Sequence, residues 1–278
     1  MFFDIDNQII IVRGGGDIAT GVVQKFHRAG LRVLILETQA PTAIRRSVSL
    51  CEAVYDGLAK VEDITCKRIS EIEELESCWL EKKVPLLIDP DGKTIAIIKP
   101  AALIDAILAK RNLGTARSMA NVTIALGPGF NAGEDVHAVI ETKRGHDLGR
   151  LILQGYAKPD TGVPGEIAGE SIRRVIRAPS EGIIIHKKQI GCVVEQGEVL
   201  FTIEDTDART TSEAKAPFKG LLRGLIREKT HVKKGMKVAD IDPRTDVDWF
   251  TISDKARCLG GAALEAYFCI SQSKGENQ

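Results

Sequence analysis

The chain has 278 residues, of which 44% are hydrophobic and 27% charged, a composition that supports ordinary hydrophobic cores and suggests two domains. Its 38 basic and 38 acidic residues cancel, so composition gives no reason to expect nucleic acid or a membrane surface as a partner. No apolar run approaches the roughly 18 residues of a membrane span, and no basic segment followed by an apolar one opens the chain. We therefore expect a cytoplasmic protein.

The first predicted elements enclose a glycine-rich turn. Gln8–Val12 is typical of a buried strand because Ile9, Ile10, Ile11 and Val12 are consecutive β-branched residues. Ile18, Val22 and Phe26 then recur on one helical face. Leu31–Glu37 is a second apolar strand that ends on an acidic residue. The segment therefore predicts a βαβ unit.

The turn in this unit matches the pattern of a nucleotide site. Gly14, Gly15, Gly16 and Asp17 form a Gly-x-Gly-x-x-Ala turn with Ala19, and Glu37 follows about 20 residues later. Glycines allow the backbone to approach a phosphate, the helix N-terminus supplies N–H groups, and the acid can hold a ribose. The alternative is a glycine-rich turn that binds nothing.

The pattern of predicted strands and helices continues after this unit. Val84–Ile88 predicts a strand, and a turn at 89–92 predicts a hairpin to a second strand over Thr94–Ile98. Pro100 favours a helix that ends near Asn112, and Asn121–Leu126 predicts another buried strand. We expect the loops after Val12, Glu37 and Leu126 to meet at one site.

Two polar segments provide candidate binding residues for an anionic ligand. The glycine-rich loop that follows Leu126 exposes backbone N–H groups, and a strand–turn–strand segment over 135–153 carries histidine and arginine side chains. From these segments we select Gly127, Gly129, Phe130, His137, Arg144 and His146. A polar loop with solvated charges is the alternative.

Two arginines and six cysteines are further candidates for a functional role. Arg45 and Arg46 follow the second strand and are candidates for phosphate binding, with a solvated loop as the equal alternative. The six cysteines are scattered without a Cys-x-x-Cys pair, which argues against structural zinc. Cys51 is nearest to the glycine turn, but the sequence gives its thiol no activating base. We predict no metal site, and the catalytic residues stay unknown.

The second half of the chain contains an internal repeat. Ala-Pro-x-x-Gly at 178–182 recurs 38 positions later at 216–220, and the register then holds without a gap. Such a period predicts two similar units that bury a face against each other. The segment resembles the barrel-sandwich hybrid of biotinyl and lipoyl carrier domains. Because the expected hairpin tip, Asp205–Thr210, has no lysine, we expect no covalent biotin or lipoate and prefer a rigid cap to a carrier.

These observations predict an α/β Rossmann-like domain over 1–170, an all-β barrel-sandwich hybrid over 171–245 and a C-terminal helical segment over 246–278. Gly260 and Gly261 lie inside the last helix, where close packing against a backbone or a ligand would explain them. We expect the tail from Ser273 onward to be disordered.

Linked motifs along nearly the whole chain resemble the YqeB family. They are residues 14–21, 43–46, 52–57, 127–130, 141–150 and 252–257. The resemblance implies an accessory protein that matures a selenium-dependent molybdenum hydroxylase, with the hydroxylase as its client. A looser likeness runs to the XdhC accessory proteins of xanthine dehydrogenase. Neither resemblance supplies catalytic residues to carry over.

Three functional hypotheses follow. The leading one is a maturation factor that binds a nucleotide or a nucleotide-bearing, molybdopterin-type cofactor. A second is an NAD(P)-dependent oxidoreductase in which His137 or His146 moves a proton. A third is a non-catalytic scaffold for hydroxylase assembly, which would bind no nucleotide.

Overall fold

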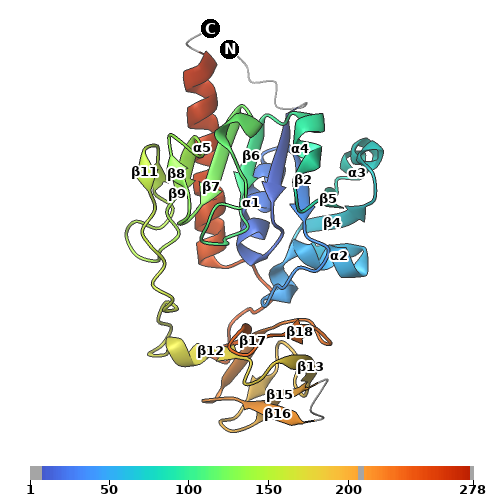
Figure 1. Cartoon of the computed structure of the whole chain (residues 1–278), viewed down its shortest axis with the longest axis vertical. Helices are drawn as coiled ribbons and strands as arrows, with labels where there is room; N and C mark the ends of the chain where they lie inside the picture. Colours follow the sequence, from blue (N-terminus) through green and yellow to red (C-terminus); the bar gives the residue numbers. More distant parts are fainter. Residues whose placement is uncertain (1–7, 206–209, 276–278) are drawn as a thin grey trace. The chain divides into compact units, whose positions relative to one another are not determined.

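The computed structural model describes residues 8–205 and 210–275, which divide into two compact units (Figure 1). Unit 1 contains the chain up to Pro41, Val48–Asp160 and the chain from Ile252 onward. Unit 2 contains Thr42–Ser47 and Thr161–Thr251. The short segment 42–47 therefore belongs to unit 2, and the C-terminal helix belongs to unit 1.

Unit 1 is built on a nine-stranded sheet in the order β10-β9-β7-β6-β1-β2-β5-β4-β3. The strands from β9 to β4 in this order are parallel, and β10 and β3 pair antiparallel at the two edges. Their bounds are β1 Ile9–Arg13, β2 Arg32–Glu37, β3 Leu58–Val61, β4 Ile64–Ile69, β5 Val84–Ile88, β6 Ala102–Asp105, β7 Val122–Leu126, β9 Ala138–Ile140 and β10 Leu151–Ile152. A separate pair is formed by β8 Asn131–Ala132 and β11 Gly155–Tyr156.

Two long helices, α1 Asp17–Arg28 and α5 Asp254–Gly275, pack on the sheet. The other α-helices are α2 Ala53–Asp56, α3 Leu75–Leu80 and α4 Lys93–Ile98. Single 3-10 turns are η1 Arg46–Val48, η2 Leu50–Glu52, η3 Ile72–Glu74, η4 Arg117–Met119 and η5 Ile172–Arg174. In the described part of the chain, no helix is long and apolar enough to span a membrane.

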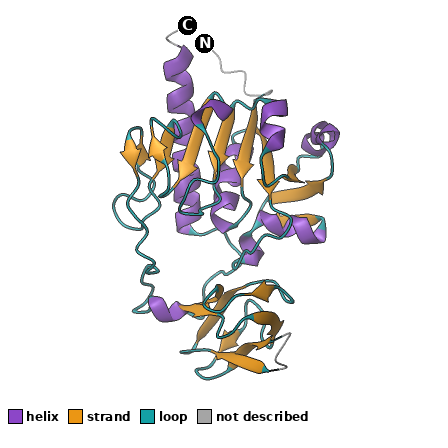
Figure 2. Ribbon diagram, in the orientation of Figure 1, coloured by secondary structure: helices purple, strands orange, loops and turns teal. Residues whose placement is uncertain are grey.

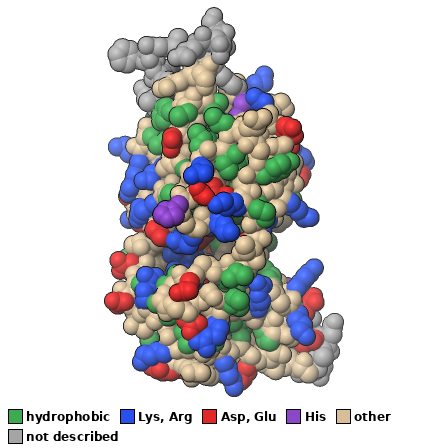
Figure 3. All heavy atoms as spheres, turned by 90° about the vertical axis from the view of Figure 1, so that its left-hand side faces the viewer, with side chains coloured by type: hydrophobic (Ala, Val, Ile, Leu, Met, Phe, Trp, Pro, Cys, Tyr) green, Lys and Arg blue, Asp and Glu red, His purple; other side chains and the backbone are tan. Residues whose placement is uncertain are grey.

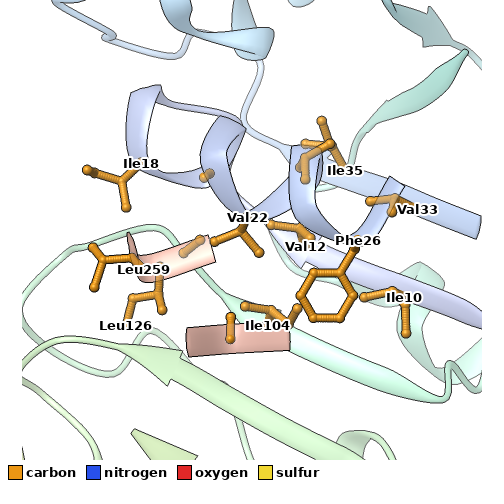
Figure 4. Close-up of a cluster of buried hydrophobic side chains, with 14 of the residues drawn as sticks. Ile10, Val12, Ile18, Val22, Phe26, Val33, Ile35, Ile104, Leu126 and Leu259 are labelled. Atoms are coloured by element: carbon orange, nitrogen blue, oxygen red, sulfur yellow. The ribbon is translucent and has the colours of Figure 1, made fainter. Parts of the chain in front are cut away.

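The main core of unit 1 lies between the sheet and the two long helices (Figure 4). Because side chains alternate along a strand, Ile10 and Val12 of β1 face this core, whereas Ile11 faces a second core on the other side of the sheet. Val22 of α1 and Leu259 of α5 are completely buried in the main core. The β-branched run that predicted β1 therefore covers both faces of the sheet, as expected for a buried parallel strand.

The helices α1 and α5 approach each other through glycine. A Cβ atom added to Gly260 would lie 2.3 Å from the carbonyl oxygen of Gly21, and one added to Gly21 would lie 2.3 Å from the oxygen of Ala256. A Cβ atom on Gly261 would meet nothing within 4 Å. Helix–helix packing therefore explains Gly260, whereas Gly261 has no such constraint.

Unit 2 consists almost entirely of strands and loops (Figure 2). It has two four-stranded antiparallel sheets, in the orders β12-β19-β17-β14 and β16-β15-β13-β18. The strands are β12 Val175–Arg177, β13 Gly182–His186, β14 Val193–Val194, β15 Val199–Glu204, β16 Thr211–Lys215, β17 Gly220–Leu225, β18 His231–Val232 and β19 Lys237–Asp242.

The sequence repeat corresponds to repeated strands. Gly182 opens β13 and Gly220 opens β17, 38 positions later, and β14 and β15 precede β18 and β19 by the same interval. The short strand of each repeat pairs with a strand of the other repeat. β14 of the first repeat pairs with β17 of the second, and β18 of the second pairs with β13 of the first. Residues 206–209, most of the expected hairpin tip, lie outside the described residues.

The predicted fold class, a Rossmann-like domain followed by a barrel-sandwich hybrid and a separate C-terminal helix, is wrong. The large sheet is mixed, and in the described part of unit 1 only α1 and α5 exceed six residues, so most strands are joined by hairpins, loops or single turns. Unit 2 forms two separate antiparallel sheets and takes in segment 42–47. One βαβ unit in the sequence does not determine the remaining connections, which depend on packing across the whole sheet.

Three local predictions also fail. Residues 93–98 form α4 instead of a strand, because the carboxylate of Asp89 accepts hydrogen bonds from the backbone N–H groups of Lys93 and Thr94 at its start. Residues 102–105 form the buried strand β6 instead of a helix, because they pair with β1 and β7 on either side. The last helix continues through Ser273 to Gly275, into the tail that was expected to be disordered.

Candidate functional site

The glycine turn lies at the carboxyl end of β1, near the middle of the parallel strands. The chain proceeds from β1 to β2 and β5 on one side, then returns to β6 on the other side of β1. In open α/β sheets, ligands bind outside the carboxyl ends of the strands where the order reverses in this way. We therefore take this edge of the sheet as the candidate site.

Two of the three glycines are held closely against neighbouring backbone. A Cβ atom on Gly14 would lie 3.2 Å from the Ala106 oxygen, and one on Gly15 would lie 3.0 Å from the Cys51 nitrogen. Gly16 differs, because nothing lies within 4 Å of its added Cβ. Gly16 is the N-cap of α1 and makes no side-chain capping bond, so the start of the helix is open on this side.

Glu37 lies directly at the turn. Its Oε1 accepts a hydrogen bond of 2.9 Å from the Gly15 N–H, and its Oε2 accepts one of 2.6 Å from the Thr38 N–H. Asp17 Oδ1 accepts a bond of 2.8 Å from the Ile18 N–H in the first turn of α1. A carboxylate has about four lone-pair positions, so Glu37 retains capacity to accept a further donor such as a sugar hydroxyl.

The loops after β7 and β9 meet at the same edge. A Cβ atom on Gly127 would lie 2.7 Å from Thr142 Oγ1, so only glycine fits there without a shift. The buried carboxylate of Glu141 accepts 2.8 Å bonds from the backbone N–H groups of Lys143 and Lys158, which connects the loop after β9 to the segment after β11. Arg144 follows and donates two bonds, of 2.8 and 3.0 Å, to Asp254 at the start of α5.

Lys255, which the sequence reasoning did not select, belongs to this cluster. Its side chain is half-buried, and burial together with the Arg144 cation lowers the pKa of its amine, against the opposing effect of the carboxylates of Asp17, Glu141 and Asp160. These neighbours come from α1, the loop after β9 and the end of Val48–Asp160. The only sequence signal was the position of Lys255 in the motif over 252–257.

The two selected histidines lie in different settings. His137 stands beside the amino-terminal half of β7, where its Nδ1 lies 3.0 Å from the Thr123 backbone nitrogen and 2.6 Å from Thr123 Oγ1. The glycine turn is at the opposite end of the parallel strands, so the structure does not bring His137 to it. His146 is exposed in the turn between β9 and β10.

The other residues of the glycine-rich loop contribute to packing. Gly129 is pressed against the loop after β6, because a Cβ atom there would lie 2.6 Å from Arg111 Cα. Phe130 is 4% exposed and packs in a small core with Ala125, Val136 and Val139. Gly129 and Phe130 therefore fix the conformation of the loop through packing contacts inside the protein.

The pair Arg45 and Arg46 belongs to unit 2. Arg46 Nε donates a 2.7 Å bond to the Leu225 carbonyl, and Arg45 Nη2 donates one of 3.2 Å to the Thr251 carbonyl. Both guanidinium groups therefore satisfy backbone carbonyls of unit 2, an arrangement that the sequence did not indicate.

Cys51 lies next to Gly15 at this edge of the sheet. Burial, with the nearby carboxylate of Glu37, raises the pKa of the Cys51 thiol far above its ordinary value, which leaves it protonated and unreactive. Within residues 8–205 and 210–275, no group of three His, Cys, Asp or Glu side chains is placed to hold a metal ion. On the face in Figure 3, Lys and Arg are intermixed with Asp and Glu among the described residues.

Several solved structures show weak similarity to the chain. TcdA (CsdL) aligns over 99% of this chain and 90% of its own, with 12% identity and a TM-score of 0.34. The ectoine utilization protein EutE (DoeB) of Ruegeria pomeroyi covers 84% and 85% with 10% identity, and an aspartoacylase family protein of Mesorhizobium loti covers 84% of both chains with 12% identity; both have a TM-score of 0.29. These scores are too low to support an argument about fold or function.

Comparison of sequences gives a clearer result. No family model matches the chain. The uncharacterized Escherichia coli (strain K12) protein YqeB is 45% identical over 265 residues, which is 95% of this chain and 48% of YqeB. The chain thus spans about half the length of this curated relative. Over the length that the two proteins share, the chain is a relative of YqeB, as the motifs led us to expect.

Proposed function

We propose that the chain is an accessory protein in the maturation of a selenium-dependent molybdenum hydroxylase and binds a nucleotide-bearing, molybdopterin-type cofactor or a nucleotide. The hydroxylase is the client in this proposal. The role comes from the resemblance to the YqeB family, and the kinship with Escherichia coli YqeB is consistent with it. The geometry of the glycine turn in unit 1 supports the location that we propose for binding.

The observation that carries the proposal is the open start of α1 beside Glu37. Gly16 leaves the helix N-terminus uncovered, and the first turn of a helix favours a negative group through its unpaired N–H groups. Glu37, bonded to the Gly15 N–H, is placed to accept from a ligand hydroxyl. A ligand with both a phosphate and a sugar, as in a nucleotide, suits this pair of groups.

A genetic test addresses the proposed role. Deletion of the gene should abolish selenium-dependent hydroxylase activity while the amount of hydroxylase protein stays unchanged, and the wild-type gene should restore activity. Glu37→Gln and Arg144→Gln should restore little of it, because they alter the candidate site. Glu73→Gln, at an exposed acid on η3, is the matched control and should restore it fully.

Two results would contradict the proposal. Full hydroxylase activity in the deletion strain would remove the maturation role. Full restoration by both site variants, with the protein bound to the hydroxylase, would favour a scaffold without a ligand at this edge.

A further inference from the structure

Lys255 carries a cationic amine that no side chain in the described part of the chain pairs with. Among residues 8–205 and 210–275, its amine makes no hydrogen bond, and no carboxylate lies within the 4.0 Å of an ion pair. Its side chain is nonetheless half-buried at the start of α5. Partial removal of an ammonium group from water costs free energy, which an anionic group that accepts from its three donors would offset.

The neighbouring acids each have another partner. Asp17 accepts from the Ile18 N–H, and both oxygens of Glu141 accept from backbone N–H groups. Asp160 pairs with Lys110 at 2.6 Å, and Asp254 pairs with Arg144. Asp17, Glu141 and Asp160 affect the Lys255 charge from a distance without binding it.

Two helices add positive potential at the same place. Because Gly21 in α1 packs against Ala256 and Gly260 in α5, and Phe26 packs against Tyr267 further along, the helices run in the same direction. Their N-termini therefore both lie at the carboxyl edge of the sheet, and each carries a partial positive charge. Lys255 stands on the first turn of α5, beside the glycine turn that begins α1.

We propose that Lys255 binds an oxyanion, of the phosphate type, at the carboxyl edge of the sheet. The inference deepens the proposed function, because it assigns the negatively charged part of the ligand to Lys255 and leaves the hydroxyl-bearing part to Glu37. It depends on the half-buried amine, the occupied acids around it and the two helix N-termini.

Inorganic pyrophosphate is the probe, with malonate to distinguish a phosphate site from a carboxylate site. Titration calorimetry on the full chain should show pyrophosphate binding that weakens at least about tenfold in Lys255→Gln and is restored in Lys255→Arg, because a charge-assisted contact is lost and regained. Lys60→Gln removes an exposed lysine on β3 and should bind like the wild type. The melting temperature of each variant verifies that it is folded.

The pH dependence of pyrophosphate binding distinguishes a lysine that contacts the ligand from one that only supports the structure. Burial and Arg144 lower the pKa of Lys255, and the carboxylates of Asp17, Glu141 and Asp160 oppose them, so the amine loses its proton below the ordinary value of 10.5. Binding should therefore weaken as pH rises through that lowered pKa in the wild type. Lys255→Arg should lack this loss, because arginine stays charged, and any titration of pyrophosphate itself affects both proteins equally.

The outcomes separate this inference from the proposed function. Binding of pyrophosphate through Lys255, with no binding of nucleotides or pterins, would support this inference and contradict the proposed function. Equal binding of a nucleotide by the wild type and Lys255→Gln would overturn this inference and leave the proposed function standing. Malonate bound in place of pyrophosphate, or no anion bound at all, would also overturn it.

Discussion

At the scale of single residues, Glu62 connects the two long helices of unit 1. Its carboxylate accepts a 2.8 Å bond from Gln24 of α1 and a 2.9 Å bond from the Ile252 N–H, and it pairs with Arg257 of α5. Burial raises the pKa of Glu62, but the bonds from Gln24, Ile252 and Arg257 lower it more, so the net shift is downward. Glu62 therefore stabilises the fold in its charged form.

The pH dependence of stability follows from that shift. A carboxyl group with a lowered pKa in the folded state stabilises fully above its unfolded value of 4.5, and this stabilisation is lost as pH falls through the folded pKa. We expect Glu62→Gln to reduce the free energy of unfolding by about 1–2 kcal/mol at pH 7 and by much less at pH 3. Urea denaturation at both pH values measures this. An equal loss at both would show that the charge of Glu62 is unimportant.

At the scale of elements, the crossing of α1 and α5 places the start of both helices at the candidate site. Gly21 and Gly260 allow backbone to approach backbone, which larger residues would prevent. The adjacent Gly261 has open space around it. Substitution at Gly260 therefore reports on the packing between the helices, whereas substitution at Gly261 reports on helix propensity alone.

Substitution of each glycine by alanine should give opposite results. Gly260→Ala should destabilise the protein by about 2 kcal/mol or more, because its methyl group overlaps the Gly21 carbonyl. Gly261→Ala should be neutral or stabilise by up to about 1 kcal/mol, because alanine favours a helix. Thermal unfolding of the two variants makes the comparison. Similar melting temperatures would contradict the close helix crossing.

The elements also explain how much could be predicted from the sequence. The strand β1, the glycine turn and α1 follow from local patterns, and the turn–Glu37 contact follows from their spacing. The sequence could not place Lys255 beside them, because Lys255 lies 238 positions after Asp17 and only the helix crossing brings them together. It also misassigned β6, whose strand conformation depends on pairing with both neighbours.

At the scale of the whole molecule, unit 2 depends on a segment that leaves unit 1 after Pro41 and returns at Val48. Within unit 2, the Leu225 N–H donates to the Ile44 carbonyl at 2.8 Å, and Arg46 donates to the Leu225 carbonyl. A Cβ atom on Gly224 would lie 2.9 Å from the Ile44 side chain. Segment 42–47 is therefore part of the fold of unit 2, which local sequence patterns could not indicate.

Loss of the hydrogen bond from Arg46 to Leu225 should destabilise unit 2 and leave the stability of unit 1 unchanged. Arg46→Met keeps the aliphatic stem but removes the donor to Leu225, which should destabilise unit 2 by about 1 kcal/mol. Hydrogen exchange should then be faster in β17 and β19 and unchanged in β1 and β6. Lys187→Met, at an exposed lysine of unit 2, serves as the control. Unchanged exchange in β17 would show that the segment contributes little.

The central claim, that a nucleotide-bearing ligand binds at the carboxyl edge of the large sheet, is tested most directly by calorimetry. The anaerobically purified chain and its Glu37→Gln variant would be titrated with ATP, CTP, NADH and molybdopterin with and without an attached nucleotide. Micromolar binding of a nucleotide or nucleotide-bearing pterin, weakened at least about tenfold in the variant, is the predicted result. No binding across the panel, or equal binding by both proteins, would contradict the account.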